Sequence, residues 1–315
     1  MRKALLIAAL LSSTLAQAEP CGLQKMAAFD IQGLSNGRIE IPITIADKPF
    51  IVMVDTGAPL GILDADVADQ IGLKRQKMPG RYEFYSLSGE GPTQFAVVPS
   101  LKLGQSEAHY TDFLIATFTG RPDNLAGTIG ADLLKNFDVE FDFENQKINL
   151  FSQDHCEGSV VYWAPFFNTA HAEINKDGHI VIKATLDGQP VDAIIDTGSP
   201  VSLVNETVSE KLLGIGLDSP GVETIGSGPD AMQRYEFKSL AFAGITVPGP
   251  RIVIAPDAMA EQSRKELTAH KMQGYHGNDI MHAPQLILGL DVLRRLHLYI
   301  AYKEKKVYLT AADAH

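Results

Sequence analysis

Apolar residues alternate with polar ones along several short runs of the chain, with the period of two that is typical of a half-buried β-strand. Isoleucine occupies every second position from residue 39 to residue 45, and a second apolar run follows a short turn, at residues 50–54. This pattern predicts a β-hairpin. Residues 179–195 repeat the same order of apolar runs and turn. The chain is therefore predicted to contain two copies of one β-rich unit.

Each predicted hairpin ends in the same three residues. The two triplets are Asp55-Thr56-Gly57 and Asp196-Thr197-Gly198. We expect the glycine of each triplet to supply the backbone freedom of a tight turn and the threonine hydroxyl to brace the loop. A surface turn with an ordinary aspartate is the alternative, but the apolar run before the second triplet favours a buried strand that delivers a carboxylate. Two such copies predict a functional pair of carboxylates, Asp55 and Asp196.

The segments after the triplets are also repeated. Residues 65–73 and 206–213 are amphipathic and predict short helices. Two further hairpins are expected at residues 81–98 and 222–237, each with a glycine-rich tip that allows it to act as a flexible cover. Four aromatic residues on these hairpins are candidates for contact with an apolar substrate, although aromatic residues are also ordinary in strands. They are Tyr82, Phe84, Tyr85 and Tyr235.

An apolar-apolar-glycine motif closes each unit, with its glycine at Gly130 in the first copy and at Gly289 in the second. Each motif is followed by a predicted short helix and a closing hairpin. The second copy is longer because of an insertion at about residues 257–285 that contains helix-forming residues and two histidines. These histidines lack the spacing and companions of a metal site, so we expect no metal.

These motifs resemble the retropepsin-like domains of bacterial aspartyl proteases, present twice in one chain. The resemblance covers residues 39–309 and implies an all-β, bilobal fold with two similar barrel-like lobes and short helices, at residues 19–155 and 156–315. It also implies one catalytic aspartate in each lobe, no cofactor and an active monomer. The residues expected to support the two catalytic loops are Thr56, Gly57, Ala58, Thr197, Gly198, Ser199, Gly130 and Gly289.

Two carboxyl groups held close together cannot both ionise cheaply, so they share one proton over a wide pH range. Such a pair can activate a water molecule for attack on a peptide bond without a metal. Ser199 has a hydroxyl that could stabilise the carboxylate of its loop, whereas Ala58 does not. We therefore expect Asp55 to lose a stabiliser of its charged form, and activity to be greatest at acidic to near-neutral pH.

Composition and the first residues bear on location. The chain has 315 residues, 45% of them hydrophobic, which is enough for two packed lobes. Residues 1–18 combine two basic residues, an apolar run and a small-residue site ending at Ala18, as in a secretory signal. We expect export to the periplasm without a membrane anchor. The net charge of −11 argues against nucleic acid or anionic membranes as partners.

Two cysteines are present, Cys21 and Cys156, and in an oxidising compartment they are predicted to form a disulfide, with two free thiols as the alternative.

The expected partner of the active site is a protein or peptide in extended conformation. A non-catalytic peptide-binding or scaffold protein on the same fold is the alternative function. Residues 33–37 also match the Gly-x-Ser-x-Gly pattern of serine hydrolases around Ser35, but a strand-like run follows them where that motif requires a helix, so a plain turn is expected.

Overall fold

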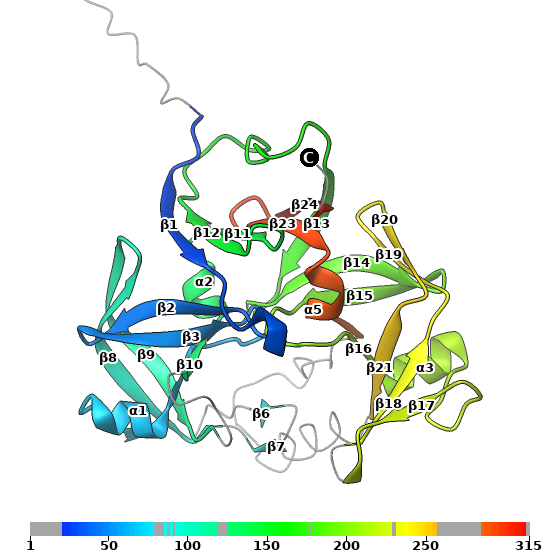
Figure 1. Ribbon diagram of the computed structural model, residues 1–315, viewed down its shortest axis with the longest axis horizontal. Helices are drawn as coiled ribbons and strands as arrows, with labels where there is room; N and C mark the ends of the chain where they lie inside the picture. Colours follow the sequence, from blue (N-terminus) through cyan, green and yellow to red (C-terminus); the bar gives the residue numbers. More distant parts are fainter. Residues whose placement is uncertain are drawn as a thin grey trace, which may run out of the picture.

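The computed structural model describes residues 21–78, 85–86, 89–90, 92–118, 125–176, 178–228, 231–256 and 285–312. The predicted signal sequence and nearly all of the insertion at residues 257–285 lie outside these residues. Strands dominate the described chain and form two lobes below a shared sheet (Figure 1). The predicted all-β, bilobal fold is confirmed.

The N-terminal lobe is a closed, barrel-like sheet. Its order is β2-β3-β10-β4-β9-β8-β5, and a further pairing of β2 with β8, at Ile45 and Leu101, closes the ring. The alternating isoleucines of β2 point into this barrel and are buried, as predicted. The elements are β2 (Glu40–Ile45), β3 (Lys48–Val54), β4 (Ile62–Asp64), α1 (Ala65–Gln70), β5 (Gln76–Lys77), β8 (Gln94–Leu103), β9 (Ser106–Ala116), β10 (Leu125–Ile129) and α2 (Ala131–Leu134). A small hairpin, β6 (Tyr85–Ser86) with β7 (Gly89–Glu90), completes this half.

The C-terminal lobe repeats this plan with one change. Its elements are β14 (Ile180–Leu186), β15 (Gln189–Ile195), β16 (Leu203–Asn205), α3 (Glu206–Leu213), β17 (Glu223–Ile225), β18 (Met232–Glu236), β19 (Ser239–Phe242), β20 (Ile245–Pro248), β21 (Arg251–Ala255), β22 (Leu286–Leu288) and α5 (Leu290–Leu293). The long β8–β9 hairpin is here split into the pairs β18–β21 and β19–β20. A backbone hydrogen bond from Phe237 N to Pro250 O, 3.0 Å long, spans the bend. Because β19 pairs with β14 as β8 pairs with β2, this lobe is also barrel-like.

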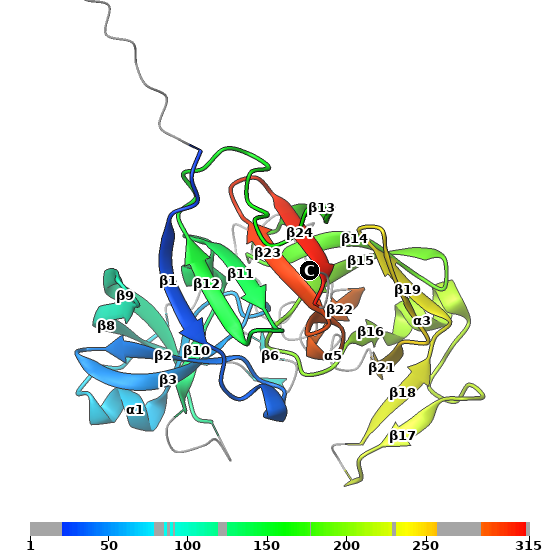
Figure 2. The same cartoon turned by 45° about the horizontal axis from the view of Figure 1, so that its top comes forward.

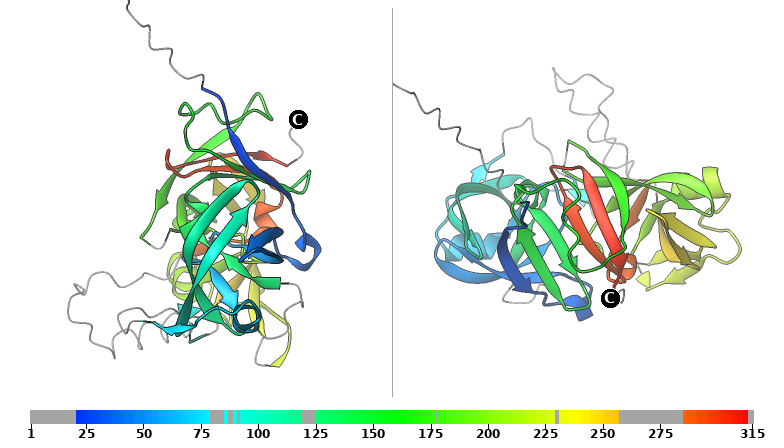
Figure 3. Two further views of the ribbon diagram at one scale, coloured as in Figure 1. Left: turned by 90° about the vertical axis from the view of Figure 1, so that its left-hand side faces the viewer. Right: turned by 90° about the horizontal axis from the view of Figure 1, so that it is seen from above.

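A shared sheet joins the lobes. Its strands, in spatial order, are β1 (Lys25–Asp30), β12 (Lys147–Phe151), β11 (Asp138–Asp142), β23 (Leu296–Ala301), β24 (Lys306–Ala311) and β13 (Asn168–Ile174). The junction is the antiparallel pairing of β11 with β23, where Phe141 lies opposite Leu298. Figures 2 and 3 show these strands side by side across both lobes. One face of the sheet contributes to a hydrophobic core that continues into both lobes.

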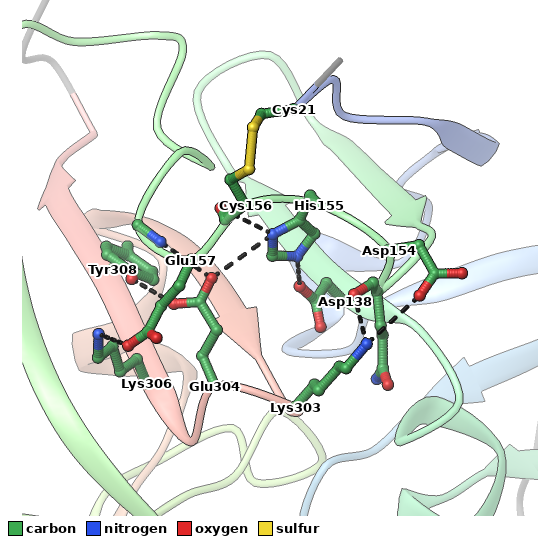
Figure 4. A network of polar contacts seen from close by, with 12 residues as sticks. Cys21, Asp138, Asp154, His155, Cys156, Glu157, Lys303, Glu304, Lys306 and Tyr308 are labelled. Atoms are coloured by element: carbon green, nitrogen blue, oxygen red, sulfur yellow. Dashed lines mark hydrogen bonds and ion pairs between the residues drawn. A yellow bond between two sulfur atoms is a disulfide. The ribbon is translucent and has the colours of Figure 1, made fainter. Parts of the chain in front are cut away.

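The outer face of the shared sheet is covered by residues 152–167, the segment that leads from β12 to β13 and contains the predicted lobe boundary at residue 155. A disulfide between Cys21 and Cys156 fastens this segment to the N-terminal end of β1, as predicted. Beside it, Nε2 of His155 lies 2.6 Å from Oδ2 of Asp138, and Glu304 lies on the other side of the ring (Figure 4). The His155 and Asp138 side chains are 2% and 0% exposed, so this contact is enclosed by protein.

A second histidine-carboxylate pair lies on the same face of β11. Glu140 is fully buried and contacts His297 Nε2 at 3.0 Å, and the Tyr162 hydroxyl donates to the same carboxylate at 2.8 Å. The indole of Trp163 stacks on the His297 ring with centroids 4.1 Å apart. Buried polar and charged side chains are stable only when they are paired and hydrogen-bonded. These contacts therefore explain how the polar side chains on the outer face of the sheet can be buried beneath residues 152–167.

The serine-containing turn has no catalytic context: Leu34–Asn36 form a single 3₁₀ turn ahead of β2. No helix among the described residues has the length and apolar character needed to cross a membrane.

Candidate active site

The two aspartates end equivalent strands, Asp55 after β3 and Asp196 after β15, and their loops meet where the lobes touch. A methyl group built on Gly57 would lie 2.4 Å from Cγ of Asp196, and one on Gly198 would lie 2.2 Å from Cγ of Asp55. Each carboxyl group therefore lies directly against the glycine of the opposite loop, and the two carboxyl groups face one another.

This contact corrects the expected role of the two glycines. Neither Gly57 nor Gly198 has a positive φ, so neither is required for left-handed backbone. Glycine is required instead because a side chain at either position would collide with the opposite carboxyl group.

Backbone N–H groups orient both carboxylates in the same way. Oδ1 of Asp55 accepts from Gly57 N at 2.8 Å and from Ala58 N at 3.0 Å. In the other lobe, Oδ1 of Asp196 accepts from Gly198 N at 2.8 Å and from Ser199 N at 3.1 Å. Hydrogen bonds of this kind favour the ionised carboxylate.

The predicted difference between Ser199 and Ala58 is wrong. The Ser199 hydroxyl donates to the carbonyl oxygen of Val201 at 2.7 Å, which uses its single proton, so it does not stabilise the Asp196 carboxylate. Ala58 and Ser199 both act through their backbone N–H groups. The difference between Ala58 and Ser199 therefore does not distinguish the two aspartates.

The two threonines lock the loops together across the lobe interface. Thr56 Oγ1 donates to the carbonyl oxygen of Ile195 at 2.7 Å and accepts from Thr197 N at 3.0 Å. Thr197 Oγ1 makes the mirror pair, to Val54 O at 2.9 Å and from Thr56 N at 3.1 Å. Both threonines are 0% exposed. Each hydroxyl thus braces the backbone of the opposite lobe, whereas the sequence suggested only that it would brace its own loop.

The apolar-apolar-glycine motifs support the catalytic loops through backbone hydrogen bonds. The residue after each motif glycine donates to a loop carbonyl: Ala131 N to Ala58 O at 2.8 Å, and Leu290 N to Ser199 O at 2.9 Å. A Cβ on Gly130 would lie 2.6 Å from Ala58 O, so only glycine allows this approach. Gly289 meets Val201 O in the same way, at 2.3 Å. The supporting role predicted for both glycines agrees with this geometry.

Burial and mutual repulsion shape the ionisation of the pair. Burial and the neighbouring Asp196 charge raise the pKa of Asp55 to about 8, against the opposing effect of its backbone donors. Burial also raises the pKa of Asp196, while the Gly198 N–H, a hydrogen bond with Asp55, the Ser199 N–H and the charge of His179 act in the opposite direction. One proton is therefore retained by the pair over a broad range of pH.

A family model described as "Aspartyl protease" matches residues 41–133 and 182–292, which together make up more than half of the chain. The chain belongs to the aspartyl protease family. Each matched segment contains one Asp-Thr-Gly triplet of this aspartyl protease, so the family and the bilobal fold support a peptidase function.

Solved structures were compared as well. Basic 7S globulin from soybean is 10% identical at a TM-score of 0.49, over 93% of this chain and 99% of that chain. An aspartic proteinase from Irpex lacteus is 12% identical at a TM-score of 0.49, over 91% of this chain and 98% of that chain. A search of curated proteins gave no significant match.

The candidate substrate-binding aromatics of this aspartyl protease are placed only in part. Tyr82 and Phe84 lie outside the described residues, and only the backbone of Tyr85 is described, in β6. Tyr235 lies in β18, where its ring packs edge-on against Phe237 with centroids 4.9 Å apart. Contact of these residues with substrate stays a prediction.

The described residues contain no cluster of three or more histidine, cysteine or acidic side chains arranged to hold a metal ion.

One residue at the site escaped sequence reasoning. His179 lies just before β14, and its Nε2 is 2.8 Å from the carbonyl oxygen of Gly57 in the opposite lobe. A signal was available, because Gly37-Arg38-Ile39 lies at the same distance in the sequence from Asp55 as Gly178-His179-Ile180 does from Asp196.

Replacement of Thr56 by valine in this aspartyl protease is expected to lower the free energy of unfolding. The isosteric change leaves the Ile195 carbonyl and the Thr197 N–H buried without their partner, at a cost of about 1–3 kcal/mol for each group. Thr56→Ser keeps the hydroxyl and serves as the control, with a much smaller loss expected. Urea unfolding measures both, and equal stability of the two variants would contradict the locking role.

Proposed function

We propose that the chain is an aspartic endopeptidase that hydrolyses peptide bonds with a water molecule activated by Asp55 and Asp196. The observation that carries this proposal is the packing of each carboxyl group against the glycine of the opposite loop, which brings two acids from distant parts of one chain together. Both acids come from the same chain, so we also propose that a monomer is active.

The reaction needs one ionised and one protonated aspartate. The ionised carboxylate accepts a proton from the water as the water oxygen attacks the peptide carbonyl carbon. The protonated partner donates its proton to the carbonyl oxygen, which gives a neutral tetrahedral intermediate with two hydroxyl groups. One hydroxyl then returns its proton through the pair to the leaving nitrogen, and the carbon-nitrogen bond breaks. The pair carries one proton throughout, and after this step that proton is back on the aspartate that held it at the start.

The substrate we propose is a protein segment in extended conformation. Such a segment can add backbone hydrogen bonds to strand edges near the aspartates and place apolar side chains on either side of the bond that is cut. The β6–β7 hairpin, which Figure 1 shows between the two lobes, is a candidate cover. We further propose that the enzyme processes other proteins of the cell envelope, since the signal-like first 18 residues direct it there.

Asp55→Asn and Asp196→Asn are each expected to lower kcat/KM by about 10³-fold, within the range supplied by general acid-base groups. Cleavage of an unfolded protein and of a library of unstructured peptides, followed by mass spectrometry, measures this. Asp192→Asn is the matched control. Asp192 lies on β15, four residues before Asp196, and contacts the exposed Lys183, so this change should leave cleavage intact.

Two outcomes contradict the proposal. If both dyad variants cut as well as the wild type, the assignment of the aspartates is wrong. If the wild type binds peptides but cuts none of them, the chain is a peptide-binding protein on a protease fold.

Activity is expected to follow a bell-shaped pH profile between mildly acidic and near-neutral values. As pH rises through about 8, Asp55 loses its proton and the pair loses its acid. As pH falls, the second carboxylate becomes protonated and the base is lost, and this occurs above the usual aspartate range because burial raises the pKa of Asp196. Measurement of kcat/KM across the pH range tests this, and a maximum below about pH 3 would exclude a buried pair.

Export is tested by the N-terminus of the mature protein. We expect the chain recovered from the periplasmic fraction of a bacterial host to begin at Glu19, as removal of the signal predicts. Mass spectrometry of the intact protein gives this directly. Recovery of the uncleaved chain from the cytoplasm would overturn the proposed location without affecting the proposed chemistry.

A further inference from the structure

His179 joins the C-terminal lobe to the catalytic loop of the N-terminal lobe. It follows the loop between β13 and β14, and its Nε2 lies 2.8 Å from the carbonyl oxygen of Gly57. A carbonyl oxygen can only accept a hydrogen bond, so Nε2 must carry the proton. The neighbouring Gly178 packs against Ala131, the first residue of α2, where an added Cβ would lie 2.6 Å from the alanine methyl group. The loop is therefore seated on the other lobe at two points.

Asn175 fixes the orientation of His179. Its Oδ1 accepts from His179 N at 3.0 Å, and its own backbone N–H donates to the His179 carbonyl oxygen at 3.1 Å. These bonds place the Asn175 amide nitrogen 3.4 Å from Nδ1 of the ring. The imidazole is thus held from its own loop on one side and bound to Gly57 on the other.

The pseudo-symmetric position in the N-terminal lobe does not do the same. Arg38 occupies the place of His179, but Glu40 binds its guanidinium, with Arg38 Nε 2.8 Å from Oε1. In the second copy the residue that corresponds to Glu40 is Val181, which has no charge to divert the histidine. Within the described part of the chain, Gly57 receives a side-chain bond from the opposite lobe and Gly198 does not.

The bond from His179 ends close to both carboxyl groups. The peptide that follows Gly57 directs the Ala58 N–H to Asp55 Oδ1, while Gly57 itself lies against Asp196. The elements packed around His179 contribute the ionisable residues Asp55, Asp196 and Asp132, and its own loop contributes Lys176. Burial raises the pKa of Asp196, and the positive charge of His179 opposes this rise.

We propose that His179 is a positioning residue of the active site, which holds the N-terminal catalytic loop against the opposite lobe and favours the negative charge on Asp196 over Asp55. This inference rests on the proposed peptidase function for its catalytic consequence. It makes Asp196 the base that receives the proton of the water and Asp55 the acid that donates to the peptide carbonyl. The asymmetry comes from a residue outside both triplets.

Two variants separate the hydrogen bond from the charge. His179→Gln keeps a donor near the position of Nε2 but cannot become charged, whereas His179→Ala removes both. Because the positive charge of His179 opposes the rise in the pKa of Asp196, its loss should raise that pKa further. We expect the acidic limb of kcat/KM to move to higher pH by roughly half a unit in both variants. The alanine variant should in addition lose kcat by about tenfold at its optimum, because the loop is no longer held.

His171→Gln is the matched control. His171 is an exposed histidine of β13, eight positions before His179 in the sequence. It undergoes the same substitution but does not contact the catalytic loop. Its pH profile should equal that of the wild type. An unchanged acidic limb in His179→Gln, together with an unchanged kcat in His179→Ala, would overturn the inference. Thermal melting of each variant identifies any that fails to fold, and the glutamine variant alone then decides the effect of charge.

A second readout keeps the inference separate from the proposed function. Titration of ¹³C-labelled aspartate side chains by NMR follows the pair directly and needs no substrate. If the titration of the pair shifts in His179→Gln while no variant cuts any peptide, the inference holds and the peptidase proposal fails. If the wild type cuts peptides but neither the titration nor the acidic limb shifts, the peptidase proposal holds and His179 has no such role.

Discussion

The exchange of hydrogen bonds between Thr56 and Thr197 is the constraint on which the active site depends. Each hydroxyl donates to a strand carbonyl of the opposite lobe and accepts the opposite threonine N–H, in a place with no exposure to solvent. Buried polar groups without partners are costly, so neither loop is satisfied unless the lobes meet in this one arrangement. Once they meet, Asp55 and Asp196 have no position other than beside each other.

Larger features keep the lobes in that arrangement. The shared sheet runs through both halves, and its outer face buries two histidine-carboxylate pairs beneath a segment fastened by the Cys21–Cys156 disulfide. The buried carboxyl groups keep these partners only while the cover remains in place, because His155 and Tyr162, which bond to Asp138 and Glu140, belong to the cover. The disulfide and these buried contacts thus fasten the cover to the sheet that connects the lobes.

The two halves repeat one fold but do not give two equivalent aspartates. The N-terminal barrel is closed by a continuous hairpin and the C-terminal one by a hairpin that bends at Phe237 and Pro250. At the site, the triplets and their backbone donors are nearly symmetric, whereas Arg38 is bound by Glu40 and His179 reaches Gly57. The proposed reaction requires one charged and one neutral aspartate. Residues that differ between the two otherwise similar copies, such as Arg38 and His179, can therefore assist it.

The sequence by itself determined the repeated hairpins, the short helices, the pair of Asp-Thr-Gly loops and the two supporting glycines, because period-two apolar patterns and short motifs are local properties of the chain. Only the tertiary structure decided how these parts are used. Gly57 is glycine because of Asp196, Thr56 and Thr197 bond to the backbone of the opposite lobe, and His179 crosses to the other lobe. Contacts between residues more than a hundred positions apart arise from the packing of the lobes, and no local pattern encodes which backbone atom another lobe will approach.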